Sequence, residues 1–460
     1  MRKLTRLSAA FVTATLFTTS FPALAAESAE LQALRLQVNA LEQQLRVIAR
    51  QIEIKEEAAA AAAPTTPKIT VNDKGFTLAS PDAANSLRLR GLVQFDSRVF
   101  FNDGGGVLNN AFVLRRARII SEGVFAKNYS FQIVPEFGGS AVSIVDANFG
   151  IAISPALQLK FGRFKSPVGL EQLQSDAWGF FNERSIVNNL VPNRDIGIQA
   201  SGDLFGARLN YAVGIFNGVA DGASTTNTDF DEEKDLVGRV FVSPFKDDAG
   251  SAVQGLSFGI AGNYSRQKTA AGHSGGYRTD GQQTFFAYNA AVIADGATWR
   301  VSPGLDYRHG SFGLLGEYVL STVNVRPSAT GAKAELQHTG WQIAAGYVLT
   351  GENSSYAGVV PATNFNPATG TWGAFEVVAR YANVDIDDAA FPLFASASTA
   401  ASEATSLGVG LNWYLSKAVR FTFDYYQTDF GFNVAAPAVS SNPVLRQDEK
   451  AFITRFQLTF

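Results

Sequence analysis

Arginine and lysine are the side chains with which this chain is best equipped to bind a ligand. The guanidinium group is planar, and its donors match the geometry of phosphate or carboxylate. A narrow, partly dehydrated passage lined by fixed positive charge would favour anions, because guanidinium groups can replace the hydration of an oxyanion. The basic residues that position and sequence alternation favour for this role are Arg90, Arg116, Arg118, Lys165, Arg184, Arg194 and Arg208.

The stretch from Arg163 to Arg194 combines such cations with carboxylates. It is too long for a plain turn, so we expect it to fold into the interior and narrow a passage there. Its acidic residues, with the one directly after it, are Glu171, Asp176, Glu183 and Asp195. An Arg–carboxylate network that only braces the segment is an equally good interpretation for any single Arg.

The composition gives little support to other chemistries. The 460 residues include no Cys and three His, which argues against thiol catalysis and against Cys- or His-built metal centres. Residues 272–276 match the G-x-S-x-G pattern, but no helix follows them, as a nucleophile elbow requires. The formal net charge of -3 gives no bulk attraction to nucleic acid. We therefore expect no enzyme, no cofactor, no metal and no nucleic-acid partner.

Residues 1–26 are typical of a secretory signal peptide. Basic residues precede an uncharged stretch from Leu7 to Phe21, and residues 23–25 read Ala-Leu-Ala, which fits a small-residue cleavage site. An uncleaved membrane anchor is the alternative. Cleavage would leave an exported chain that is more acidic than the full sequence.

Residues 27–63 are expected to form a coiled coil. Apolar residues recur there at 3,4 spacing: Leu31, Leu34, Val38, Leu41, Leu45, Ile48 and Ile52. The residue types along this seam allow a trimer but do not specify one. A lone amphipathic helix lying on its own domain is the alternative. Pro64 and Pro67 end the helix, so residues 64–86 are expected to be a linker.

From residue 87 to residue 460 the hydrophobic period changes from 3.5 to 2. Segments of about ten residues alternate apolar with polar or small side chains and are separated by Gly, Asp, Asn and Pro. Sixteen such segments predict an all-β fold, a sixteen-stranded antiparallel transmembrane β-barrel with a water-filled lumen. A single segment would also fit a soluble sandwich, but the repetition favours the barrel.

The alternation also predicts where connections lie. One predicted strand covers residues 204–216 and would point Arg208 inward. Short turns, such as residues 202–203, would lie on the periplasmic side. Long loops, such as 217–233 and 266–297, would lie outside.

The last predicted strand ends in an aromatic residue. Phe452, Phe456, Leu458 and the terminal Phe460 share one face. Such an ending resembles the assembly signal of Gram-negative outer-membrane barrels, which implies that the barrel-assembly machinery recognises Phe460.

Six motifs in order resemble the phosphate-selective porin O and P family. They are FVLRRARI at 112–119, FGRFKSPVGLE at 161–171, NERS at 182–185, PNRDIG at 192–197, YVLTGE at 347–352 and LNWY at 411–414. The resemblance covers about residues 87–460. It implies a trimeric sixteen-stranded channel in the Gram-negative outer membrane. Some members of the family select anions and phosphate, and several carry an amino-terminal coiled coil.

The sequence therefore predicts an outer-membrane channel for passive diffusion of small anions, with phosphate or polyphosphate as the candidate solute. The expected partners are outer-membrane lipid and two further copies of the chain in a homotrimer, with the amino-terminal helix in the periplasm. A general or sugar porin with weak charge preference is one alternative, because the mature chain is acidic. An outer-membrane tether that acts through the coiled coil is another.

Overall fold

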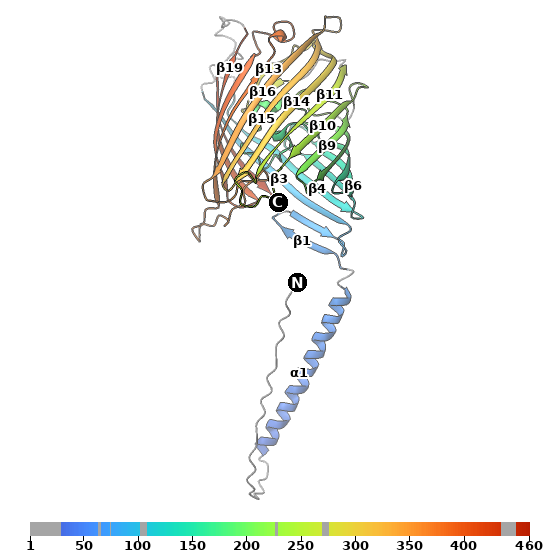
Figure 1. Ribbon diagram of the computed structural model, residues 1–460. Helices are drawn as coiled ribbons and strands as arrows, with labels where there is room; N and C mark the ends of the chain where they lie inside the picture. Colours follow the sequence, from blue (N-terminus) through green and yellow to red (C-terminus); the bar gives the residue numbers. More distant parts are fainter. Residues whose placement is uncertain are drawn as a thin grey trace. The chain divides into compact units, whose positions relative to one another are not determined.

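The computed structural model describes residues 29–62, 66–73, 75–101, 108–225, 229–268, 276–433 and 448–460. The predicted signal peptide and the G-x-S-x-G motif, apart from its last glycine, lie outside the described residues. The chain divides into two units, Met1–Thr66 and Pro67–Phe460, and each is described by itself (Figure 1).

The first unit contains one long helix in its described part, α1 (Ala29–Ala62). Its apolar seam is open to solvent, with Leu34, Leu41 and Leu45 exposed by 62%, 58% and 63%. Neither α1 nor any other described helix is long and apolar enough to cross a membrane. The helix itself is present as expected, whereas its pairing in a coiled coil stays a prediction.

The second unit is a closed antiparallel β-barrel (Figure 1). Successive strands pair along the chain, and β20 pairs with β3 to close the sheet. In the described residues the barrel has sixteen strands: β3 (Ser86–Phe101), β4 (Ala111–Phe125), β5 (Tyr129–Glu136), β6 (Ser143–Ser154), β7 (Leu157–Lys165), β8 (Arg194–Leu204), β9 (Leu209–Phe216), β10 (Asp235–Val242), β11 (Leu256–Lys268), β14 (Ile293–His309), β15 (Phe312–Arg326), β16 (Ala334–Val348), β17 (Ala374–Asp385), β18 (Glu403–Tyr414), β19 (Val419–Gly431) and β20 (Asp448–Thr459). The predicted fold class is confirmed.

Burial along the strands follows the alternation. On β17, Val377 and Tyr381 are 40% and 43% exposed, whereas Glu376 and Arg380 are each 2% exposed. Apolar side chains therefore face outward and charged ones inward, as a barrel in lipid requires. A soluble sandwich would show the opposite arrangement.

One β-bulge interrupts this alternation on β4. Gln94 of β3 lies opposite Arg116, but the next residue, Phe95, lies opposite Leu114. Arg115 is therefore the extra residue of the bulge and has no partner in this register. As a result, Arg115 and Arg116 both contact groups inside the barrel.

The predicted linker is shorter than expected. Within residues 64–86, strands β1 (Lys68–Asn72) and β2 (Gly75–Ala79) form a hairpin, and β2 pairs with the start of β3. Its alternation of Ile69, Val71, Phe76 and Leu78 with polar residues is the signal that the linker interpretation passed over.

The predicted strand 204–216 is wrong at its start. Residues 205–208 form a turn in which Phe205 and Ala207 have φ values of 52° and 63°, and β9 begins only at Leu209. Left-handed backbone is incompatible with a continuous strand. Arg208 therefore lies in this turn, and its half-exposed side chain pairs with Asp247 at 2.9 Å.

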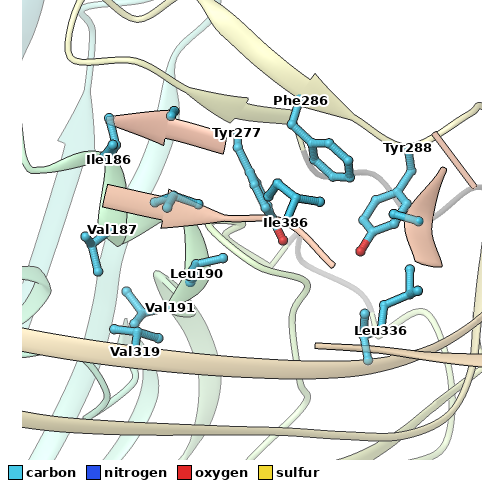
Figure 2. Packing of buried hydrophobic residues seen from close by; sticks show 14 of the residues in the cluster. Ile186, Val187, Leu190, Val191, Tyr277, Phe286, Tyr288, Val319, Leu336 and Ile386 are labelled. Atoms are coloured by element: carbon cyan, nitrogen blue, oxygen red, sulfur yellow. The ribbon is translucent and has the colours of Figure 1, made fainter. Parts of the chain in front are cut away.

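Two connections fold into the barrel. Residues 166–193, between β7 and β8, include α2 (Leu170–Leu173) and the 3-10 helix η1 (Ile186–Leu190), which contact β14 to β17. We call residues 166–193 the constriction segment. Val187 and Leu190 of η1 are fully buried in one apolar cluster with aromatic residues (Figure 2).

The second infolded connection is the hairpin of β12 (Gly276–Arg278) and β13 (Thr284–Ala287). Its Tyr277 and Phe286 are buried in the same cluster as η1 (Figure 2). Between the two strands, Asp280 accepts from Arg380 on β17 at 2.5 Å. The expectation of an external loop over all of 266–297 is therefore wrong, because this part supplies apolar side chains to the interior.

Candidate functional site

The main chain of the constriction segment is held by a row of side chains from the barrel wall. Backbone carbonyl groups from Asp176 to Glu183 accept hydrogen bonds from strands β3, β17, β18, β19 and β20. The bonds are Gln94 Nε2 to Asp176 O (3.0 Å), Gln457 Nε2 to Ala177 O (2.9 Å), Arg420 Nη1 to Gly179 O (2.9 Å), Asn412 Nδ2 to Phe180 O (2.8 Å), Arg455 Nη1 to Asn182 O, and Arg380 Nη1 to Glu183 O (3.1 Å).

These bonds assign several inward cations to anchoring. Arg380, Arg420 and Arg455 are each at most 2% exposed. Because their donors bind backbone oxygens of the constriction segment, they fix its position across the lumen and do not line a passage. For these three residues, the bracing interpretation is the correct one.

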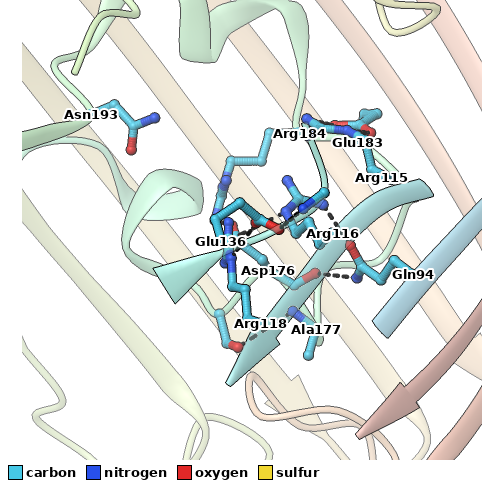
Figure 3. Close-up of polar contacts among 12 residues, drawn as sticks. Gln94, Arg115, Arg116, Arg118, Glu136, Asp176, Ala177, Glu183, Arg184 and Asn193 are labelled. Carbon is cyan, nitrogen blue, oxygen red and sulfur yellow. Dashed lines mark hydrogen bonds and ion pairs between the residues drawn. The ribbon is translucent and has the colours of Figure 1, made fainter. Parts of the chain in front are cut away.

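A second group of arginines converges on the Asp176 carboxylate (Figure 3). Arg118 and Arg184 donate directly to its two oxygens. Arg116 Nε and Arg194 Nη2 lie 3.7 and 3.6 Å from Oδ2. The structure thus brings four of the predicted cations together around one carboxylate: two from β4, one from β8 and one from the constriction segment.

Positive charge remains in excess around Asp176. Arg118 Nε also lies 2.6 Å from Glu136, and Arg194 Nε lies 3.2 Å from Asp146. Lys165 donates to the Gln174 carbonyl at 2.7 Å and forms no ion pair with a described residue. Four guanidinium groups therefore face three carboxylates here, namely Arg116, Arg118, Arg184 and Arg194 against Glu136, Asp146 and Asp176.

The charge state of Asp176, on the connection between β7 and β8, follows from these neighbours. Burial alone would raise the pKa of its carboxyl group, but the guanidinium groups of Arg184 and Arg116 hold that pKa well below its usual range. Asp176 is therefore ionised and keeps the arginine side chains in place.

Arg115 belongs to a neighbouring cluster that strict alternation misses. Its Nε lies 2.6 Å from Glu183 Oε1, which also receives Arg455 at 2.8 Å and Arg98 at 3.4 Å. The sequence contains a signal for this arrangement. Strict alternation would turn Arg115 towards lipid, where a charged side chain costs about 2–4 kcal/mol near the bilayer centre, so an interruption of the alternation is expected there.

Two vestibules meet at the Asp176 cluster. The first is lined by Arg115 and Arg116 and by residues of the long connections, such as Ser224 and Gln282. The second is lined by residues near the short turns, such as Lys160. Long loops lie outside and short turns inside in outer-membrane barrels, so we call these spaces the outer and inner vestibules. Both are lined by Arg118, Asp176 and Arg194.

The remaining predicted site residues lie elsewhere. Arg90 lines the inner vestibule and pairs with Glu122 through two bonds of 2.9 and 2.8 Å. Arg208 lies in the turn between β8 and β9, so its assignment to an inward strand position is wrong. No cluster of acidic or His side chains with the geometry of a metal site occurs among the described residues.

A closed sixteen-stranded barrel with two vestibules and an infolded constriction segment defines a porin of the outer membrane. The family described as "Phosphate-selective porin O and P" matches residues 87–460, and the chain belongs to this family. Porin O of Pseudomonas aeruginosa is 24% identical over 420 residues, covering 84% of this chain and 91% of that protein.

Solved structures share the fold at low sequence identity. Outer-membrane expressed OmpT of Vibrio cholerae has a TM-score of 0.53 at 11% identity, covering 85% of this chain and 100% of that chain. The outer membrane channel DcaP of Acinetobacter baumannii has a TM-score of 0.52 at 11% identity, with coverages of 82% and 98%. The anion-selective porin from Comamonas acidovorans has a TM-score of 0.50 at 14% identity, with coverages of 82% and 100%.

Proposed function

We propose that this porin is a passive diffusion channel that selects small anions, with phosphate or polyphosphate as the principal solute. The observation that carries the proposal is the excess of cations around Asp176, where the two vestibules share their lining. An anion that enters this region exchanges part of its hydration for guanidinium donors, whereas a cation meets net repulsion.

The arrangement also suits conduction. Arg115 and Arg116 line the outer vestibule, and Arg118 and Arg194 line both vestibules. An anion therefore passes between several donors that are already partly neutralised by carboxylates. Several weak sites in series allow release, which one tight site would prevent. The family description and the name of the Comamonas acidovorans porin support anion transport by relatives of this kind.

The assembly follows from the same family and from the helix. We infer a homotrimer in the outer membrane, with α1 in the periplasm as a coiled coil and with Phe460 as the signal for barrel assembly. A trimer form is named for OmpT of Vibrio cholerae. The chain acts as a channel and not as an enzyme.

The test of anion selectivity is the reversal potential of purified protein in planar bilayers under a KCl gradient. Arg116, Arg118 and Arg184 are changed to Ala singly and together, and phosphate block of the chloride current is a second readout. We expect the triple variant to lose several-fold in the ratio of anion to cation permeability, since a tenfold change needs only about 1.4 kcal/mol.

The matched control is Arg208→Ala, which removes a guanidinium outside the passage and should leave the reversal potential unchanged. Anion selectivity that survives the triple substitution would refute the assignment of these residues. Wild-type protein without anion preference would favour a general or sugar porin. Absence of any conductance would favour the tether.

A further inference from the structure

Two amide side chains of the constriction segment line the outer vestibule together with the arginines. Gln172 lies in α2, and Asn193 directly precedes β8. Both line the same space as Arg116, Arg118 and Arg194. Figure 3 shows Asn193 apart from the arginine cluster around Asp176. A solute that passes through the outer vestibule therefore meets both the arginines and these amides.

Arg194 fixes which way both amides point. Its Nη1 lies 3.2 Å from Asn193 Oδ1. A guanidinium group can only donate, so the atom of Asn193 that faces it must be the carbonyl oxygen. Gln172 Nε2 donates to that same oxygen. After these two hydrogen bonds, Gln172 still has a free acceptor, its carbonyl oxygen Oε1. Asn193 still has a free donor, its amide nitrogen Nδ2.

These two remaining atoms are open to the vestibule. Among the described residues, no donor reaches Gln172 Oε1 and no acceptor reaches Asn193 Nδ2. Gln172 as a whole is only 3% exposed. Its Oε1 nevertheless keeps some contact with solvent. A fixed acceptor beside a cationic passage repels an anion that has only acceptor oxygens. It binds an anion that carries a hydroxyl proton.

We propose that Gln172 and Asn193 make this passage select oxyanions that carry an O–H group over oxyanions of equal charge that lack one. The inference rests on the proposed anion channel and names its solute class more closely. Hydrogen phosphate donates its O–H to Gln172 Oε1 and accepts from Asn193 Nδ2, while its other oxygens face the neighbouring Arg194. Sulfate has no proton to donate, so Gln172 Oε1 loses hydration without gaining a partner.

The experiment compares two dianions as blockers of the chloride current through wild-type protein in planar bilayers. At mildly alkaline pH, hydrogen phosphate and sulfate carry the same charge, and only the former carries a hydroxyl. We expect half-block by phosphate at about fivefold lower concentration than by sulfate, the factor that one hydrogen bond of about 1 kcal/mol provides. Gln172→Leu should bring the two concentrations together.

Two variants keep the result interpretable. Gln172→Met preserves the length of the side chain without the amide acceptor. If Gln172→Leu does not fold, Gln172→Met takes its place and should likewise bring the two blocking concentrations together. Gln158→Leu, at an exposed position near the β6–β7 turn, should retain full discrimination. Equal block by the two anions in an anion-selective wild type, or discrimination that survives at Gln172→Met, would overturn this inference alone. A wild type without anion preference would overturn the proposed function and the inference with it.

Discussion

Arg118 and Asp176 form a direct ion pair at the place where the outer and inner vestibules share their lining. The pair joins strand β4 to the constriction segment, so the barrel wall and the infolded loop meet through opposite charges. Arg118 uses its other edge to bind Glu136. The cation that borders the passage is therefore held from two sides and cannot swing away from it.

Replacing Asp176 by Asn should raise anion selectivity. The change removes the carboxylate that partly neutralises four guanidinium groups, and it keeps a similar shape. We expect the ratio of anion to cation permeability to increase several-fold in reversal-potential measurements. Asp203→Asn, at an exposed position near the β8–β9 turn, is the control and should change nothing. A lower ratio in Asp176→Asn would contradict the view that Asp176 limits the positive charge.

The bulge at Arg115 can be tested by chemical labelling. The chain has no Cys, so single cysteines report only the position at which they are placed. We expect Arg115→Cys and Arg116→Cys both to react with a charged, water-soluble thiol reagent. Leu114→Cys, on the lipid-facing side, should react far more slowly. Protection of Arg115→Cys would mean that β4 alternates without interruption.

Breaking an anchor should loosen the constriction segment. Arg455 binds Asp96, Glu183 and the Asn182 carbonyl, and Arg455→Met leaves two buried carboxylates with fewer partners. The loss of such a buried partner costs about 3–5 kcal/mol. We expect unfolding in detergent at a lower temperature, together with larger and noisier single-channel currents. Lys450→Met, on the same strand but paired only with Asp448 among the ion pairs described, is the control.

The sequence predicts the barrel well because lipid and water impose opposite requirements on neighbouring residues. The resulting period of 2 is visible along most of the described barrel strands, with β4 interrupted at its bulge. The infolding of residues 166–193 was also predictable, because a connection of that length with so many charges does not suit a turn. These features depend on local pattern and on segment length.

The pairing of charges was not predictable in the same way. Arg455 and Glu183 are 272 residues apart in the chain, and only the closure of the barrel brings them together. No local pattern distinguishes such an anchor from Arg116 or Arg118, because all three occupy inward positions. Arg208 was misplaced because a left-handed turn at residues 205–208 ended the strand alternation early.

The terminal Phe460 should matter for folding as well as for recognition. Its ring lies so close to Gly91 that a Cβ added there would be 2.3 Å from it, and it packs edge-on against Phe76 at 6.4 Å. Deleting Phe460 should lower the folded, heat-modifiable fraction in membranes, and Gly91→Ala should do so to a smaller extent. Unchanged assembly after the deletion would show that the barrel folds and inserts without Phe460.

The exposed seam of α1 should contribute to the stability of the oligomer. Leu41→Asp combined with Leu45→Asp places charge in adjacent core positions of the expected coiled coil, where an unpaired carboxylate is strongly unfavourable. We expect the oligomer to dissociate at a lower detergent concentration or temperature, while single-channel conductance stays the same. Gln43→Asp and Gln44→Asp, between these positions, add the same charge without entering the seam and serve as the control. Equal resistance of all variants would show that the barrel contacts alone hold the subunits together. In an isolated 27–63 peptide, helicity that does not depend on concentration would argue against a coiled coil.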